Sequence, residues 1–169
     1  MPPLPGSHQL MWLLLLPPLL VFALDQASKW LILWFMDGRM PPIVPVTDFF
    51  NLVLVYNPGV SFGLFAQHDP MGAMMMGIFA FVVGLVVIYF AHKADGLERL
   101  GYGFIAGGAL GNGLDRFLHG AVVDFLDFHV SAWHFWAFNV ADAGITIGVV
   151  LLLVAGFFGG DKQAADSNA

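Results

Sequence analysis

The chain has 169 residues, of which 59% are hydrophobic and only 11% are charged, and its formal net charge is −6. Soluble domains carry about 25% charged residues, and so few charges could not cover the apolar surface of a soluble fold. The composition therefore indicates a polytopic membrane protein and excludes soluble enzymes and nucleic-acid binders, since no basic cluster is present.

Four apolar stretches approach the roughly 20 residues that a helix needs to cross a bilayer, so the sequence predicts four membrane spans. These spans cover residues 10–36, 71–91, 100–118 and 139–159. Pro17 and Pro18 are expected to kink or restart the first helix. A cleaved signal peptide is the alternative for this stretch, but residues 1–9 contain no Lys or Arg. We therefore expect one integral membrane domain over residues 1–169.

The basic residues predict the orientation of these spans. Four spans put both termini and residues 92–99 on the same side of the membrane. That side carries Lys93, Arg99 and Lys162, whereas the opposite side carries only Arg39. Because Lys and Arg accumulate in cytoplasmic loops, both termini are predicted to be cytoplasmic.

The two segments on the opposite side, residues 37–70 and 119–138, are predicted to lie in the membrane interface. Residues 41–66 are rich in Val, Phe and Pro, which predicts short strands around a turn at Asn57-Pro58-Gly59. The second segment combines aromatic side chains with His and Asp and has no Lys or Arg. Aromatic rings are favoured at the membrane interface.

Ionisable side chains inside apolar stretches are costly and are usually paired or functional. Asp25 and Lys29 are four residues apart, with the acid first, which favours an ion pair on one helix face. Asn112, Asp115 and Arg116 lie on adjoining turns of the third predicted span. They indicate either a structural network or contact with a substrate.

Two aspartates are the strongest candidates for catalysis. Asp124 has apolar neighbours, which are expected to raise its pKa, and Asp142 lies in the first turn of the last span, where Asn139 can cap the helix. Taken alone, Asp142 could simply be a helix-start acid. Together, two carboxylates at one membrane depth can share a proton, so that one stays protonated while the other activates water. This division of labour suits peptide hydrolysis without a metal.

Two other chemistries are disfavoured. Residues 59–63 match the G-x-S-x-G pattern around a nucleophilic serine, Ser61, but the chain has no room for the α/β sheet that this pattern requires. A metal site is conceivable from the acidic and histidine side chains of the last third of the chain. These are Asp124, Asp127, His129, His134 and Asp142. Their spacing matches no zinc motif, and the chain has no Cys, so we expect neither a metal nor a cofactor.

Five sequence blocks occur in the order and at the separations typical of one family. They are DQASK at 25–29, NPGVSFG at 57–63, GGALGNGLDR at 107–116, VVDF at 122–125 and FNVAD at 138–142. On these blocks the chain resembles the lipoprotein signal peptidases (type II signal peptidases), aspartic proteases of the bacterial inner membrane. One departure is visible, because the family's N-x-G-A-A-F-G pattern has Val60 and Ser61 here; we expect this to tune shape without loss of function.

The resemblance implies a membrane all-α fold: a four-transmembrane-helix bundle with a small periplasmic β-cradle and a short periplasmic interfacial helix. It makes Asp124 and Asp142 the catalytic dyad. It implies supporting and substrate-binding roles for residues around this dyad. These are Asn57, Gly108, Asn112, Asp115, Arg116, Asn139, Asp25 and Lys29.

The implied reaction is cleavage of diacylglyceryl-modified prolipoproteins immediately before the lipidated Cys, which releases the signal peptide. The expected partners are these precursors and membrane lipid, and the enzyme is expected to be a monomer with its active site near the periplasmic face. One alternative is a small proton- or ion-coupled transporter, but the acids cluster at span ends and the two halves of the chain do not match. The other alternative is a non-catalytic membrane assembly factor, in which mutation of both aspartates would be silent.

Overall fold

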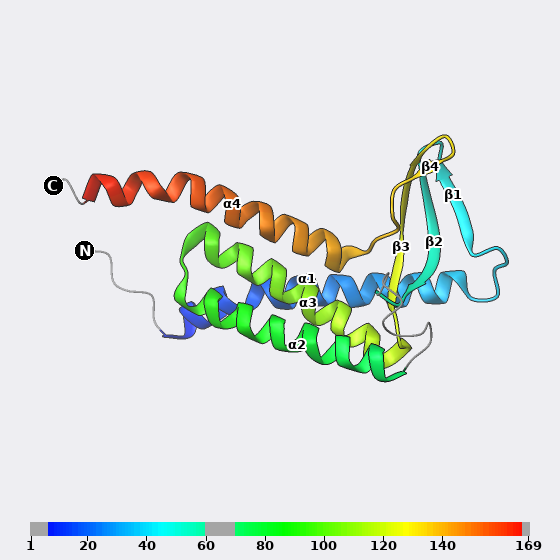
Figure 1. The fold of residues 1–169 in the computed structure, drawn as a ribbon, viewed down its shortest axis with the longest axis horizontal. Helices are drawn as coiled ribbons and strands as arrows, with labels where there is room; N and C mark the ends of the chain where they lie inside the picture. The colour runs from blue at the N-terminus through cyan, green and yellow to red at the C-terminus, as the bar shows by residue number, and fades with distance from the viewer. Residues whose placement is uncertain (1–6, 60–69, 167–169) are drawn as a thin grey trace.

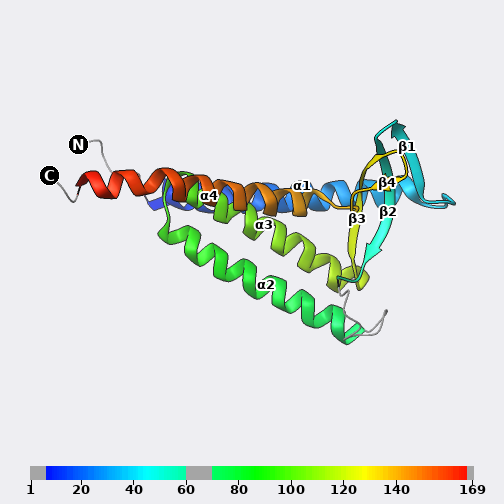
Figure 2. The ribbon, with the colours of Figure 1, turned by 45° about the horizontal axis from the view of Figure 1, so that its top comes forward.

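The computed structural model describes residues 7–59 and 70–166, in which four long helices form a bundle and a small sheet lies at one end (Figure 1). The helices are α1 (Ser7–Met36), α2 (Pro70–Lys93), α3 (Gly96–His119) and α4 (Val140–Asp166). The strands are β1 (Ile43–Thr47), β2 (Phe50–Asn57), β3 (Val122–Val130) and β4 (Trp133–His134). The start of α1 and the end of α4 point away from the sheet, and the segments that meet at the sheet are the end of α1, the end of α3 and the start of α4 (Figures 1 and 2).

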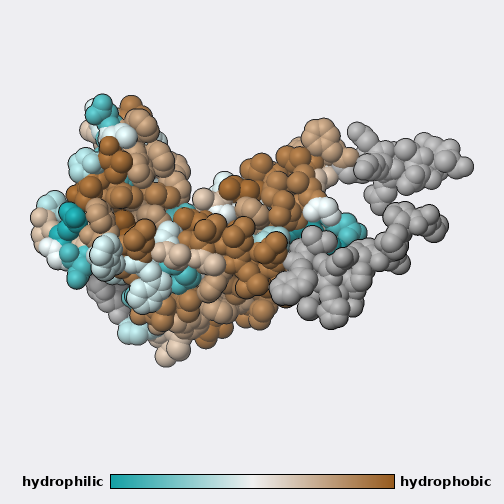
Figure 3. Space-filling view, turned by 180° about the vertical axis from the view of Figure 1, so that it is seen from behind, coloured by the Kyte–Doolittle hydropathy of each residue, from teal (hydrophilic) through white to brown (hydrophobic). Residues whose placement is uncertain are grey.

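Three of the four predicted spans are confirmed as helices long and apolar enough to cross a membrane. They are Leu14–Met36, Pro70–Lys93 and Val140–Phe158. Apolar side chains such as Leu24, Phe79 and Leu153 are exposed on these helices, and Figure 3 shows a largely hydrophobic surface over the bundle. This exposure is expected where the surrounding solvent is lipid.

The helix α3 forms over the third predicted span but is less apolar than the others. It contacts α1, α2 and α4, and its buried positions are mostly Gly and Ala. Small residues let helix backbones approach closely inside a membrane bundle. A fourth crossing by α3 therefore stays a prediction.

The helix α1 continues through Pro17 and Pro18, so the expected restart there is wrong. Glycines of α3 lie against these prolines: a Cβ added at Gly103 would be 2.7 Å from Pro17 Cβ, and one at Gly107 would be 2.5 Å from the Pro18 carbonyl oxygen. Proline inside an isolated helix is destabilising, and here α3 packs closely against the two prolines of α1.

The sheet is antiparallel with the strand order β1-β2-β3-β4. The predicted strands within residues 41–66 are confirmed as β1 and β2, which are joined by a turn at Asp48 and Phe49 that the sequence did not predict. Asp favours turns, and Thr47 Oγ1 accepts a hydrogen bond from the Phe49 amide at 3.4 Å, whereas the β-branched run that follows stays in the strand. At the predicted turn, Asn57 is the last residue of β2, its Oδ1 accepts a hydrogen bond from the Gly59 N–H, and Gly59 has a φ of +79°. Residues 60–66, the rest of the predicted strand segment, lie outside the described residues.

The short interfacial helix that the resemblance implied is absent from described residues 37–59 and 120–139. The second of these segments forms β3 and β4 instead, and the first half of β3 is buried on both faces. Val123 and Phe125 of β3 pack with Ile32 and Met36 of α1 in a small core that holds the sheet on the bundle.

Candidate active site

Asp124 lies on β3 and its side chain is only 2% exposed. Asn57 Nδ2, at the end of β2, donates to Asp124 Oδ2 at 2.9 Å, and Asn139 Nδ2 donates to Asp124 Oδ1 at 2.7 Å. The Asn57 amide is oriented in turn by the Gly59 N–H, which donates to Asn57 Oδ1 at 2.9 Å. The carboxyl group of Asp124 is therefore removed from water and held by two amides.

Asp142 lies in the first turn of α4 and is half-buried. Its carboxylate accepts hydrogen bonds from Asn112 Nδ2 at 2.8 Å and from the Asn139 backbone N–H at 3.1 Å. The Asp142 N–H donates to Asn139 Oδ1 at 3.0 Å, which confirms the predicted cap. The cap leaves Asn139 Nδ2 free to donate to Asp124, so one fully buried asparagine links the two aspartates.

The two aspartates differ in their surroundings. Burial raises the pKa of Asp124, the hydrogen bond from Asn57 opposes this, and the nearby Asp142 carboxylate raises it further, to about 6. This agrees with the rise expected from its apolar sequence neighbours. Asp124 is therefore the member of the pair that holds a proton more readily than an ordinary carboxyl group.

Arg116 of α3 faces both aspartates. Its Nη1 donates to the Asn112 carbonyl oxygen at 2.9 Å, and its charge acts on Asp115, Asp142 and Asp124. Its buried Nε–H has no acceptor within the part of the chain that the structure describes. A buried donor without an acceptor is costly, so this N–H is suited to a carbonyl or carboxylate group brought by a ligand.

The predicted Asp25–Lys29 ion pair is confirmed, with Lys29 Nζ 2.8 Å from Asp25 Oδ2. The tertiary structure adds Asp115 Oδ2 at 2.8 Å and Asn112 Oδ1 at 3.0 Å to the contacts of the same ammonium group. Asp25, Lys29 and Asp115 are nearly inaccessible to solvent. We call these three residues the ion triad.

Gln26 was not among the predicted site residues. Its amide donates to Asp115 Oδ1 at 3.1 Å and to the Gly111 carbonyl oxygen at 3.3 Å. A polar side chain between Asp25 and Lys29 in an otherwise apolar stretch was the signal that could have identified it.

Gly108, predicted to support the site, does so through packing. A Cβ at this position would clash with the Ala141 carbonyl oxygen and lie 2.7 Å from Ile145 Cγ1. A Cβ at Gly111 would likewise clash with the Asp25 carboxylate. The two glycines let α3 approach the start of α4 and the ion triad closely.

The residues of the metal alternative separate into two groups. Asp124 and Asp142 join the asparagines, whereas Asp127 accepts hydrogen bonds from Asn51 at 2.8 Å and from His134 at 2.9 Å. Burial opposes ionisation of Asp127, but these bonds outweigh it and lower its pKa. Within the described ranges no three acidic, His or Cys side chains are arranged to hold a metal ion. Ser61, the alternative nucleophile, lies outside the described residues.

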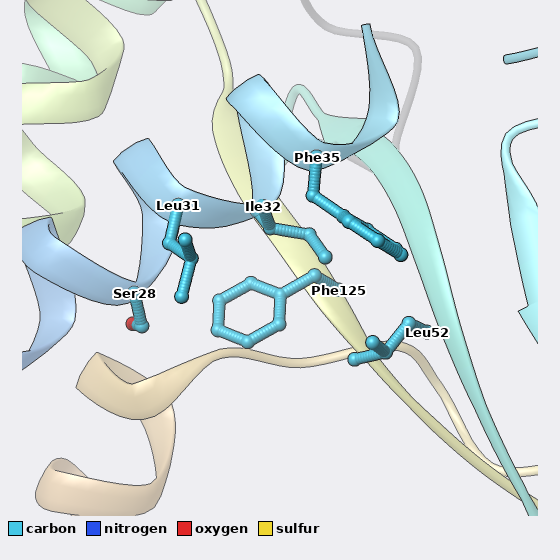
Figure 4. Close-up of a pocket in the computed structure, with 6 residues that line it drawn as sticks. All are labelled: Ser28, Leu31, Ile32, Phe35, Leu52 and Phe125. Atoms are coloured by element: carbon cyan, nitrogen blue, oxygen red, sulfur yellow. The ribbon is translucent and has the colours of Figure 1, made fainter. Parts of the chain in front are cut away.

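An apolar cavity of about 290 Å³ lies on the face of β3 that carries Phe125, opposite the face that carries Asp124 (Figure 4). Residues of α1, β2 and β3 line it, namely Ser28, Leu31, Ile32, Phe35, Leu52 and Phe125. Because side chains alternate along a strand, Phe125 points to α1 while Asp124 points to the asparagines. The aspartates therefore lie beside the hydrophobic end of the bundle without facing this cavity.

Comparisons with known proteins agree with this geometry. A family model described as signal peptidase (SPase) II matches residues 18–158. A lipoprotein signal peptidase of Rhodopseudomonas palustris (strain TIE-1) is 41% identical over 150 residues, which are 86% of this chain and 92% of the relative. One of Burkholderia cenocepacia (strain J2315) is 48% identical over 140 residues, which are 80% of this chain and 81% of the relative. A bacterial membrane enzyme solved by the in meso method at 2.3 Å resolution has a TM-score of 0.72 at 26% identity, covering 94% of this chain and 93% of that one.

Proposed function

The chain belongs to the signal peptidase II family, and on that premise we propose that Asp124 and Asp142 are the dyad with which it cleaves its substrates. It is a multi-pass membrane protease that removes signal peptides from prolipoproteins. The observation that carries the dyad is Asn139, which donates to Asp124 through its side chain and to Asp142 through its backbone. The family favours proteolysis over the transporter and assembly-factor alternatives.

The environments of the two aspartates suggest how they divide the work. Asp124, whose pKa is raised by burial to about 6, holds the shared proton. Asp142, which is half-buried, takes a proton from a water molecule as that water attacks the carbonyl carbon of the scissile bond, and Asp124 gives its proton to the carbonyl oxygen. As the C–N bond breaks, the proton on Asp142 passes to the leaving amine, and the hydroxyl formed on the carbonyl oxygen returns its proton to Asp124.

Three further groups are suited to binding the peptide. The Nε–H of Arg116 has no acceptor among the described residues, and the charge of this guanidinium group interacts with both aspartates. Asn57 of β2 is hydrogen-bonded to Asp124, and Asn112 of α3 is hydrogen-bonded to Asp142, so both amides lie next to the aspartates. Both catalytic groups come from one chain, so a monomer is sufficient for the reaction.

We further propose that α3 is the fourth span and that the sheet is a periplasmic cradle. The start of α1, the end of α4 and the α2–α3 connection lie at the opposite end of the bundle from the sheet (Figure 1). Lys93 and Arg99 flank the α2–α3 connection in the sequence. The positive-inside tendency then favours cytoplasmic termini and a dyad near the periplasmic face of the inner membrane.

The test is direct cleavage. We expect the purified protein in detergent to release the signal peptide from a diacylglyceryl-modified precursor, with the new N-terminus at the lipidated Cys. Mass spectrometry of both products would locate the bond. Cleavage at another bond would contradict the proposed substrate geometry, and no cleavage by folded protein would contradict the activity.

Activity is expected to survive extensive treatment with EDTA, because the two carboxylates supply both proton transfers. The measurement is the initial cleavage rate before and after chelation, with the melting temperature as a control for folding. Loss of rate at an unchanged melting temperature, restored by one divalent ion, would support a metal mechanism instead.

A further inference from the structure

We propose that Lys29 is a positioning residue for the proteolytic reaction, which fixes Asp124 and Asp142 relative to each other through the two acids of the ion triad. The inference rests on the proposed dyad and deepens it. It concerns a residue of α1, which contributes neither aspartate.

The Lys29 ammonium group is 2% exposed. It donates hydrogen bonds to Asp25 Oδ2 at 2.8 Å and to Asn112 Oδ1 at 3.0 Å, and it forms an ion pair with Asp115 Oδ2 at 2.8 Å. The acceptors belong to two helices, α1 and α3. One buried cation therefore fixes two carboxylates and one amide of the bundle.

Each of these carboxylates also holds a backbone N–H directly before a dyad aspartate. Asp25 Oδ1 accepts from the Ala141 N–H at 2.9 Å, and Asp115 Oδ2 accepts from the Val123 N–H at 2.9 Å. Ala141 and Val123 are both fully buried. The peptide units that carry the two aspartates are thus attached, through short charged hydrogen bonds, to groups that share Lys29.

Lys29 also helps to orient the side-chain amide of Asn112, which donates a hydrogen bond to Asp142. An ammonium group can only donate, so Asn112 must turn Oδ1 toward Lys29 and Nδ2 toward Asp142, to which it donates at 2.8 Å. Backbone N–H groups orient the other two amides, those of Asn57 and Asn139. Asn139 Nδ2 also donates to Asn112 Oδ1, at 3.2 Å, so Lys29 and Asn139 together orient the Asn112 amide, and Lys29 is the charged one of the two.

A purely structural ion pair would behave differently from a positioning one. Loss of a buried charge partner destabilises a fold but leaves the kinetics of the molecules that remain folded unchanged. Displacement of a catalytic group by about 1 Å can cost roughly 100-fold in rate. The two roles are separated by kcat, KM and the pH profile, measured on folded enzyme.

The decisive variant is Lys29→Arg, which keeps the positive charge but replaces the compact ammonium group with a wider, planar one. We expect folded protein with kcat lowered roughly 10- to 100-fold and KM for the lipidated precursor changed less than about twofold. Lys29→Met, which leaves two buried acids without their cation, should lower kcat further or prevent folding.

The pH profile of Lys29→Arg gives a second measure of geometry. The charged groups facing Asp124 are Asp142 of α4, Lys29 of α1 and Arg116 of α3, and β2 contributes the neutral Asn57. Asp142 is the one that raises the pKa of Asp124. If the aspartates separate, that pKa falls, so the alkaline limb of kcat/KM should move to lower pH.

Gly101→Ala is the matched control for a loosened bundle. Its Cβ would lie 2.9 Å from the Gly148 carbonyl oxygen, so it disturbs α3–α4 packing without touching the ion triad. We expect a lower melting temperature with unchanged kcat and pH profile. If this variant reproduces the kinetic changes of Lys29→Arg, the positioning role is wrong.

Wild-type kcat and pH profile in Lys29→Arg would also overturn the inference. If neither variant at position 29 folds, Asp115→Asn decides by the same criteria, because it removes the charge that pairs with Lys29 and places an NH2 group where Asp115 Oδ1 now accepts from Gln26. An inactive Asp124→Asn beside a Lys29→Arg of wild-type kinetics would leave the proposed dyad intact and exclude only the positioning role.

Discussion

Asp124→Asn and Asp142→Asn are each expected to lower kcat roughly 10³-fold or more while the protein still inserts and folds. An amide can neither accept the proton of the attacking water nor give a proton to the carbonyl oxygen. Asn has nearly the shape of Asp, and its side-chain oxygen can still accept hydrogen bonds from neighbouring donors. The new NH2 group faces a donor at either position, so some loss of melting temperature is expected, but the loss of turnover should persist in the folded protein, measured with saturating lipidated precursor.

Asp127→Asn is the matched control for these two variants. Asp127 lies on β3 three residues after Asp124 and is also buried, but it is bonded to Asn51 and His134. The same substitution there should cost some stability and leave kcat within about twofold of the wild type. Turnover near the wild-type level in Asp124→Asn or Asp142→Asn would exclude that residue from catalysis.

Lipidation of the substrate is expected to have the second large effect. The dyad lies where the sheet meets the bundle, beside helices whose outer faces are apolar. A precursor without its diacylglyceryl group is anchored only by its signal helix, so its scissile bond is poorly fixed in depth. Each buried methylene of the two acyl chains adds about 0.8 kcal/mol of anchoring. Energy that fixes the bond at the height of the dyad should appear in kcat as well as in KM.

We therefore expect a precursor with Ser in place of its Cys, or the same precursor before lipidation, to be cleaved at least about 100-fold more slowly. The matched comparison uses one precursor sequence in the same detergent, with and without the lipid. A soluble peptide that spans the cleavage site serves as a third arm, in which the signal helix is also missing. Equal rates for lipidated and bare precursors would show that the enzyme recognises peptide sequence alone.

Several features of the protein were predictable from the sequence because they depend on local spacing or on composition. The apolar stretches predicted the long helices, since crossing a bilayer requires length and hydrophobicity alone. The Asp25–Lys29 pair and the Asn139 cap join residues within one helical turn of each other. The five sequence blocks, taken in order, were sufficient to identify the family.

The contacts between distant segments of the chain were decided by the tertiary structure. Asp115 joins Lys29 from another helix, and Asn57 at the end of β2 reaches Asp124 on the neighbouring strand β3. No spacing rule predicts contacts between residues 67 or 86 positions apart, because they depend on how helices and strands pack. The side chains available for chemistry are given by the sequence, and the packing of helices against each other and against the sheet decided which of them meet.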